Sequence, residues 1–119
     1  KYVNTDKDIH VRIYRFIIGC FPNVVRKIPK STENLPIIEQ ISSSLTSMGA
    51  NDQEADAAIS KKDFVAKYTI VKKETKETNY WLRIVRDTGL LTASLVDPYI
   101  GESQQILLIV SKIIGNTIK

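Results

Sequence analysis

Three glutamates stand where a helical protein could use carboxylates to bind a metal. Glu74 and Glu77 are three residues apart, so a helix places them on one face, and Glu54 could approach them from a neighbouring helix. A di-iron site in a bundle requires two Glu-x-x-His pairs in addition to two further glutamates. The sequence contains one histidine, His10, and no Glu-x-x-His. A metal-dependent bundle enzyme therefore ranks third among three functional hypotheses, and we expect no cofactor.

Nucleophilic catalysis has no support in the sequence. His10 and Cys20 are its only histidine and cysteine, and they lie ten residues apart in one predicted helix. That separation is about 15 Å along a helix axis, which is too far for a hydrogen bond. There is no Gly-x-Ser-x-Gly motif and no glycine-rich phosphate loop. We therefore predict a protein that is not an enzyme.

Basic residues form the second candidate site. Eight of the 17 Lys and Arg residues lie within residues 61–86. Four of them fall at offsets of 0, 4, 11 and 14, starting at Lys72, which makes one helical stripe with Asn79 in its gap. Such a stripe can follow a phosphate backbone, because each neutralised phosphate releases a counterion. Alternatively, it is a solvated face with internal Glu–Lys pairs. The candidates for nucleic-acid binding are Arg12, Arg15, Lys72, Lys76, Arg83 and Arg86.

The single tryptophan, Trp81, lies beside the apolar seam of the same predicted helix, next to Tyr80. Aromatic residues on bundle helices fill cores and interfaces more often than they stack on bases. We therefore expect Trp81 to be a packing anchor between helices.

Two helices are predicted in the first half of the chain. The first covers about residues 6–28, where apolar residues recur at helical spacing, with Thr5 or Asp6 as its cap. Pro22 lies within it, so we expect a kink or two shorter helices. The second begins near Asn34 or Leu35, and its apolar face includes Ile38, Ile41, Leu45, Met48, Ala55 and Ile59. Gly49 in this helix indicates either close packing or a local break.

Two further helices are predicted in the second half. The third follows Ser60, whose spacing to Asp63 resembles a capping box, and it ends at Gly89. Its seam alternates by four and three residues from Phe64 to Val85. The fourth is expected to begin at Asp97-Pro98, with the aspartate as cap. Apolar residues surround much of its circumference, so we expect it to bury a second face, against another subunit.

These elements predict an all-α fold, an antiparallel up-down-up-down four-helix bundle in a single domain of residues 1–119. The composition is that of a globular protein, with 43% hydrophobic and 25% charged residues and a net charge of +4. No apolar run approaches the ~18 residues of a membrane span. A lone cysteine fits a reducing compartment, so we expect a cytoplasmic location.

The central part of the sequence resembles a known family, the four-helix-bundle proteins encoded within intervening sequences of bacterial 23S ribosomal RNA genes. The family pattern has a Gly-Ala-Asn turn followed by Glu-Ala, then a Ser and a Phe at the start of the third helix, a Lys-Glu pair, Glu-Thr and Trp-Leu. Two residues depart from it: Asp52 stands where an apolar or aromatic residue is common, and Pro22 is unusual. The matching residues are Gly49, Ala50, Asn51, Glu54, Ala55, Ser60, Phe64, Lys73, Glu74, Glu77, Thr78, Trp81 and Leu82.

The resemblance implies a ring-like homopentamer without established catalytic residues. It also implies a likeness in fold to accessory proteins of diversity-generating retroelements, basic pentamers that bind a reverse transcriptase and nucleic acid. Asn51, Glu54, Glu74 and Glu77 would then form a buried polar network or an interface lock. The first hypothesis is thus a self-associating bundle that binds RNA or DNA. The second is a protein-interaction scaffold that docks a polymerase or reverse transcriptase and does not bind nucleic acid.

Overall fold

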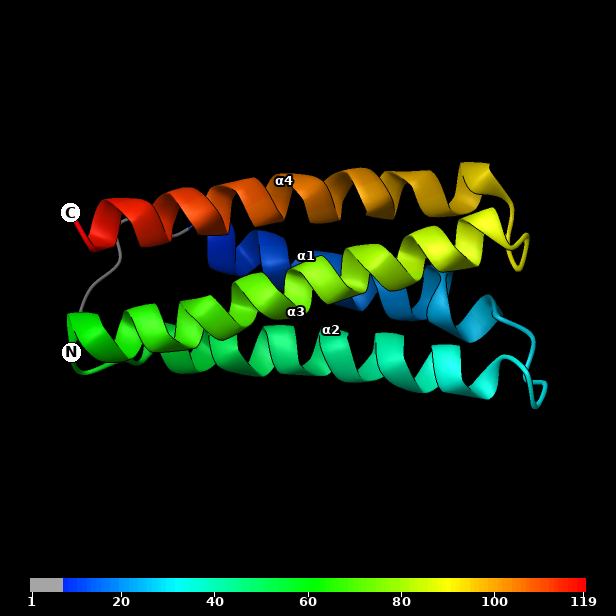
Figure 1. Cartoon of the computed structure of the whole chain (residues 1–119), viewed down its shortest axis with the longest axis horizontal. Helices are drawn as coiled ribbons and strands as arrows, with labels where there is room; N and C mark the ends of the chain where they lie inside the picture. Colours follow the sequence, from blue (N-terminus) through cyan, green and yellow to red (C-terminus); the bar gives the residue numbers. More distant parts are fainter. Residues whose placement is uncertain (1–7) are drawn as a thin grey trace.

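The computed structural model describes residues 8–119 and contains four long helices. They are joined by short connections, the α1–α2 and α3–α4 connections at one end of the bundle and the α2–α3 turn at the other (Figure 1). The prediction of an all-α up-down-up-down bundle is confirmed. The elements are α1 (Asp8–Asn23), a short 3-10 turn η1 (Val25–Lys27), α2 (Leu35–Asp56), α3 (Lys61–Asp87) and α4 (Ala93–Thr117).

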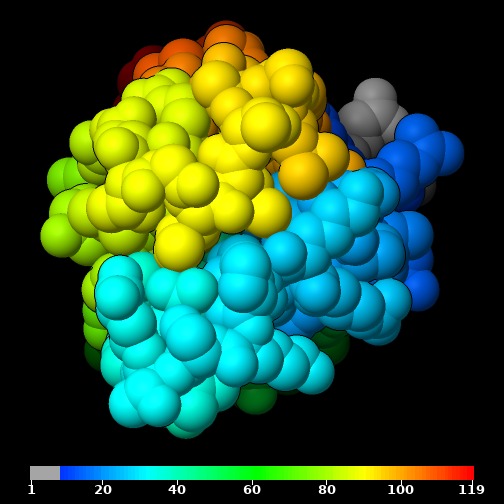
Figure 2. All heavy atoms as spheres, turned by 90° about the vertical axis from the view of Figure 1, so that its right-hand side faces the viewer, coloured from blue at the N-terminus to red at the C-terminus, as the bar shows by residue number. Residues whose placement is uncertain are grey.

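The packing order of the helices places α1 and α3 on opposite sides of the molecule. Helix α1 packs against α2 and α4, and α3 packs against the same two helices, whereas the backbones of the described parts of α1 and α3 do not lie next to each other. These two helices meet only through side chains that reach across the core, such as the rings of His10 and Tyr68, whose centroids are 6.2 Å apart. Seen along the bundle, α3 in green and α1 in blue occupy opposite edges (Figure 2). Side chains that point outward from these two helices therefore belong to different surfaces.

Helix α1 ends one residue after Pro22. The backbone N–H of Val24 still donates to the Cys20 carbonyl at 2.9 Å, and the chain then turns into η1. The expectation that the segment of about residues 6–28 divides into two shorter helices near Pro22 is confirmed, and the second of them is only the 3-10 turn η1. The predicted caps, Thr5 and Asp6, lie outside the described residues.

Helix α2 starts at Leu35, as predicted, and Pro36 lies in its first turn. It continues through Gly49 without a break. A Cβ atom at Gly49 would lie 2.8 Å from Ile17 Cδ1, so the glycine allows α1 to approach closely. Ile59 does not belong to the apolar face, because it follows the end of α2 and is 81% exposed.

Helix α3 has the boundaries and the buried seam that the sequence predicts. Ser60 Oγ accepts a hydrogen bond from the Asp63 N–H at 3.0 Å, which caps the first turn. At the other end Gly89 has a φ of +77°, and the Leu90 N–H donates to the Val85 carbonyl at 3.1 Å, which is the Schellman pattern. The seam is buried at Phe64, Tyr68, Val71, Thr75, Thr78, Leu82 and Val85.

The predicted start of the last helix is wrong. Helix α4 begins at Ala93, and Pro98 lies inside it. Pro98 is the sixth residue of the helix and has no N–H, so the hydrogen bond to the Ser94 carbonyl is lost. The additional turn places Val96 in the core with 0% exposure, and Asp97 forms an ion pair with Arg86 instead of acting as a cap.

Candidate nucleic-acid interface

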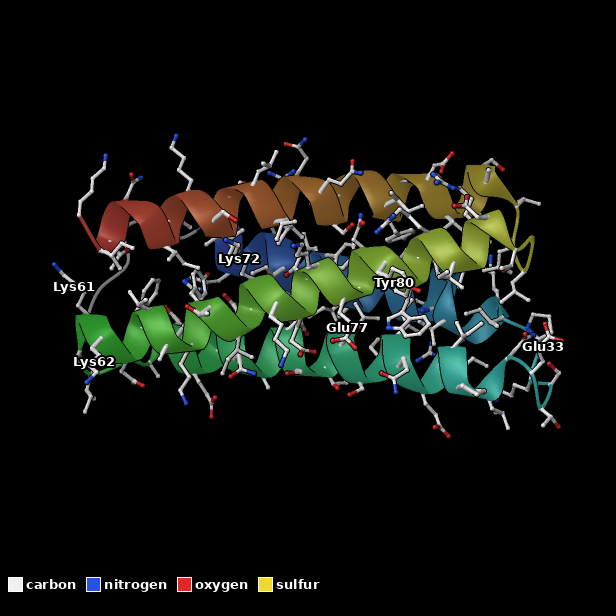
Figure 3. All side chains as sticks on the ribbon, in the orientation of Figure 1. Glu33, Lys61, Lys62, Lys72, Glu77 and Tyr80 are labelled. Carbon is white, nitrogen blue, oxygen red and sulfur yellow. The ribbon has the colours of Figure 1, made fainter. Side chains whose placement is uncertain are left out.

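Three of the predicted cations form a row along α3. Lys72, Lys76 and Arg83 are exposed, and none of them forms an ion pair within residues 8–119. Figure 3 shows Lys72 on the α4 side of α3, whereas Glu77 lies toward α2. We call these three residues the α3 row. Its cations are free to meet anions from solution.

The sequence predicts that Asn79 fills the gap in this row, but its side chain does not point outward with the cations. Its amide Nδ2 donates to Ser103 Oγ on α4 at 2.8 Å, so the side chain is turned toward the neighbouring helix. Its Oδ1 accepts a hydrogen bond from Arg83 Nε at 2.9 Å. Asn79 thereby anchors Arg83 to the bundle. The two terminal guanidinium nitrogens of Arg83 have no acceptor in the part of the chain that the structure describes.

Two of the predicted cations are already paired with carboxylates. Arg12 binds Glu102 through two hydrogen bonds, at 2.7 and 2.8 Å, and the hydrogen bonding raises the pKa of Arg12. Arg86 binds Asp87 at 2.8 Å and Asp97 at 3.0 Å, and these hydrogen bonds raise the pKa of Arg86. A phosphate would have to compete with these carboxylates, so neither residue belongs to the open cationic surface.

Arg15 is exposed but lies on α1, on the opposite side from α3. Together with Arg12 it borders a groove of about 740 Å³ between α1 and α4, which Phe16 and Tyr99 also line. The structure therefore separates the six predicted cations into the α3 row, two neutralised arginines and one isolated arginine.

The four residues of the predicted polar network do not contact one another through any hydrogen bond or ion pair among the described residues. Asn51 donates within its own helix, to the Ser47 carbonyl at 2.9 Å. Glu54 lies 3.7 Å from Lys67 Nζ at the surface. Glu74 is buried, with 9% exposure, and Glu77 is partly buried beside it.

Glu74 has a perturbed acidity because of its position. Burial raises the pKa of its carboxyl group, and the nearby charge of Glu77 raises it further. Lys73, whose Nζ lies 4.0 Å from Glu74 Oε1, lowers the pKa and so offsets part of this effect. The ionised form of Glu74 is therefore disfavoured by its surroundings.

A buried polar cluster that the sequence reasoning missed joins three helices around Asp52. This aspartate is 1% exposed, and its Oδ1 accepts a hydrogen bond from Tyr68 Oη at 2.7 Å. His10 Nδ1 lies 2.8 Å from the same oxygen, and His10 Nε2 lies 3.4 Å from Asp56 Oδ1. The sequence does contain a sign of this cluster. Asp52 follows Met48 by four residues and so lies on the apolar face of α2, and a buried carboxylate needs hydrogen-bond partners.

Residues 8–112 match the family model described as 23S rRNA-intervening sequence protein. The chain belongs to this family. A crystal structure of a protein with unknown function from the S23 ribosomal protein family of Bacteroides thetaiotaomicron VPI-5482 has a TM-score of 0.80 to this chain and 29% sequence identity. The match covers 89% of this chain and 97% of the other. No curated protein matches the chain.

In this 23S rRNA-intervening sequence protein, Trp81 packs against the core beside Tyr80. The two ring centroids are 5.0 Å apart, with an interplanar angle of 76°, which is an edge-to-face arrangement. The indole Nε1 is buried and has no hydrogen-bond acceptor among residues 8–119. Trp81 thus supports the inner side of Tyr80, which is itself 47% exposed.

The structure buries the lone cysteine and gathers no metal-binding cluster among the described residues. Cys20 is 0% exposed, and burial raises the pKa of its thiol to about 12, so it is not ionised near neutral pH. Within residues 8–119 no three His, Cys, Asp or Glu side chains are grouped so that they could hold a metal ion. No described helix combines the length and the apolar character that crossing a bilayer requires.

Proposed function

We propose that this 23S rRNA-intervening sequence protein is a non-enzymatic, self-associating helical bundle of the cytoplasm whose α3 surface binds the phosphates of RNA or DNA. The observation that supports the proposal is the α3 row, three exposed cations without carboxylate partners. Lys72 and Arg83 are 11 residues apart, which corresponds to about 16 Å along the helix axis. A row of this length spans several phosphates of one strand.

The same observation defines how the protein would bind. Contacts to phosphates fix the position of a protein on nucleic acid but carry no sequence information. We therefore expect binding that depends on charge and not on sequence. One chain has a net charge of only +4, so a single copy would bind weakly. Several copies in one assembly would multiply the number of rows and raise the avidity.

Self-association is supported by the outer face of α1. Val11, Tyr14 and Ile18 follow one another at helical spacing and are 49%, 62% and 52% exposed. Beside them lies a groove of about 310 Å³ between α1 and α2, which is lined largely by uncharged residues, Gly49 among them. Low charge and an exposed aromatic side chain are typical of interface cores.

We expect light scattering at micromolar concentration to give a mass of five times the 13.4 kDa of one chain. The number five comes from the resemblance to pentameric proteins, and the α1 face supports self-association in general. A mass of one chain under these conditions would contradict the proposed assembly.

The second candidate function is a scaffold that docks another protein, such as a polymerase. The exposed α1 face favours it, because the same apolar surface could receive a different partner. The two candidates differ in their dependence on salt: contacts to phosphates weaken steeply as salt rises, whereas an apolar contact does not.

The proposal is tested by fluorescence anisotropy with a structured RNA and a duplex DNA. With three phosphates neutralised per chain, we expect the affinity for duplex DNA to fall roughly 40-fold between about 50 and 200 mM salt. Binding that is unaffected by salt would favour the scaffold. Absence of binding to both probes at the lower salt concentration would contradict the proposed nucleic-acid function.

A further inference from the structure

Tyr80 stands within the α3 row. It follows Lys76 by four residues and precedes Arg83 by three, so the three side chains are neighbours on one face of the helix. Tyr80 is 47% exposed, although it belongs to a helix whose other aromatic side chains are buried or partly buried. Figure 3 shows Tyr80 on the same helix as Lys72. An exposed ring among cations requires an explanation other than core packing.

The ring of Tyr80 is supported by its neighbours. Trp81 meets it edge to face at 5.0 Å, and Arg83 Cζ lies over the ring, 5.8 Å from its centroid. Arg83 is in turn held by Asn79, which is fixed to α4. The aromatic surface and the cation beside it are therefore positioned before any ligand arrives.

Nearby carboxylates offset only part of the charge of this surface. Glu77 is partly buried and lies on the α2 side of the helix (Figure 3). Glu74 is buried. Asp87, beyond Arg83, is hydrogen-bonded to Arg86, which lowers its pKa, and the charge of Arg83 lowers that pKa further. Asp87 therefore offsets part of the charge at the Arg83 end of the row, whereas Lys76 forms no ion pair among the described residues. Glu77, which precedes Tyr80 by three residues, thus points away from the row (Figure 3).

Building on the proposed function, we propose that Tyr80 stacks on an unpaired base, so that the α3 surface prefers single-stranded nucleic acid to a duplex. Lys76 and Arg83 are about 10 Å apart along the helix axis, and the ring lies between them. A base on the ring would bring its flanking phosphates toward these two cations. In a duplex the base faces are covered by their neighbours in the stack, so the ring has nothing to contact.

Two substitutions of Tyr80 separate the aromatic surface from the other properties of the residue. Tyr80→Phe keeps the ring and removes the hydroxyl group, whereas Tyr80→Leu keeps an apolar side chain with good helix propensity and removes the ring. The probes are a labelled DNA strand of mixed sequence and the duplex that it forms with its complement. Because the side chain is half exposed, we expect both variants to fold, which circular dichroism checks.

We expect Tyr80→Leu to bind the single strand about tenfold more weakly than the wild type, with a change of less than twofold for the duplex. Tyr80→Phe should bind both probes as the wild type does. The fluorescence of the single tryptophan, Trp81, provides a second measurement of base stacking, because a base on the neighbouring Tyr80 ring would change its emission. Single-strand binding should therefore alter the Trp81 emission more than duplex binding.

Equal losses on both probes, or no loss on either, would overturn the stacking role while leaving the proposed phosphate binding intact. If the wild-type protein binds neither DNA probe at low salt, the stacking role fails. If it does not bind the structured RNA either, the proposed function fails as well.

Discussion

Replacing Asp52 with alanine should lower the free energy of unfolding by about 3 kcal/mol. The carboxylate is 1% exposed and accepts from Tyr68 Oη at 2.7 Å, with His10 Nδ1 at 2.8 Å from the same oxygen. Its removal takes away the buried carboxylate to which both groups are bound, and a hydrogen bond to a charged group is worth about 1.5–3 kcal/mol. The three residues come from three helices, so the loss weakens the packing of α1 and α3 onto α2.

Urea unfolding followed by circular dichroism measures this change, since the transition midpoint shifts in proportion to stability. Asp56→Ala is the matched control: its carboxylate is 51% exposed and lies 3.4 Å from His10 Nε2, so we expect a change below about 0.5 kcal/mol. Tyr68→Phe should lose about 1 kcal/mol, because it removes one hydrogen bond and keeps the packing. If Asp52→Ala is as stable as Asp56→Ala, the cluster does not hold the helices together.

The parts of the fold that the sequence predicted well are those decided by neighbouring residues. The Ser60 cap and the left-handed Gly89 define α3 locally, and its seam repeats within single helical turns. The start of α4 was missed because a local rule, proline at the first helical position, was overridden by the burial of Val96 in the core. Tertiary packing can thus extend a helix by a turn beyond the start that local sequence signals predict.

In the candidate site, too, local features could be predicted from the sequence, whereas contacts between distant residues could not. The spacing of Lys72, Lys76 and Arg83 follows from helix periodicity, so the row could be predicted. The neutralisation of Arg12 could not, because its partner Glu102 lies 90 residues away. The bond between His10 and Asp52 likewise spans 42 residues. Helical spacing shows which side chains share a face, but the partners on other helices depend on how the helices pack.

Reversing the charge of the α3 row should abolish binding to nucleic acid. In the triple variant Lys72→Glu, Lys76→Glu and Arg83→Glu, we expect the affinity for RNA and for duplex DNA to fall more than about 100-fold at low salt, because three phosphate contacts become repulsive. The slope of log affinity against log salt should flatten by about three. Anisotropy over a salt series measures both quantities. The three side chains are exposed, so we expect the bundle to remain folded.

A control variant with the same net charge as the triple variant shows whether binding depends on the position of the cations or only on the total charge. Arg15, Lys27 and Lys30 are exposed and lie on α1, on η1 and in the loop that follows, away from the α3 row. Reversing all three also changes the net charge from +4 to −2, since each reversal removes two charges. We expect this control to weaken binding only several-fold, because solvent-exposed charges beyond ~10 Å are screened. Equal losses in the two variants would mean that net charge attracts the nucleic acid and that the α3 row is not its binding surface.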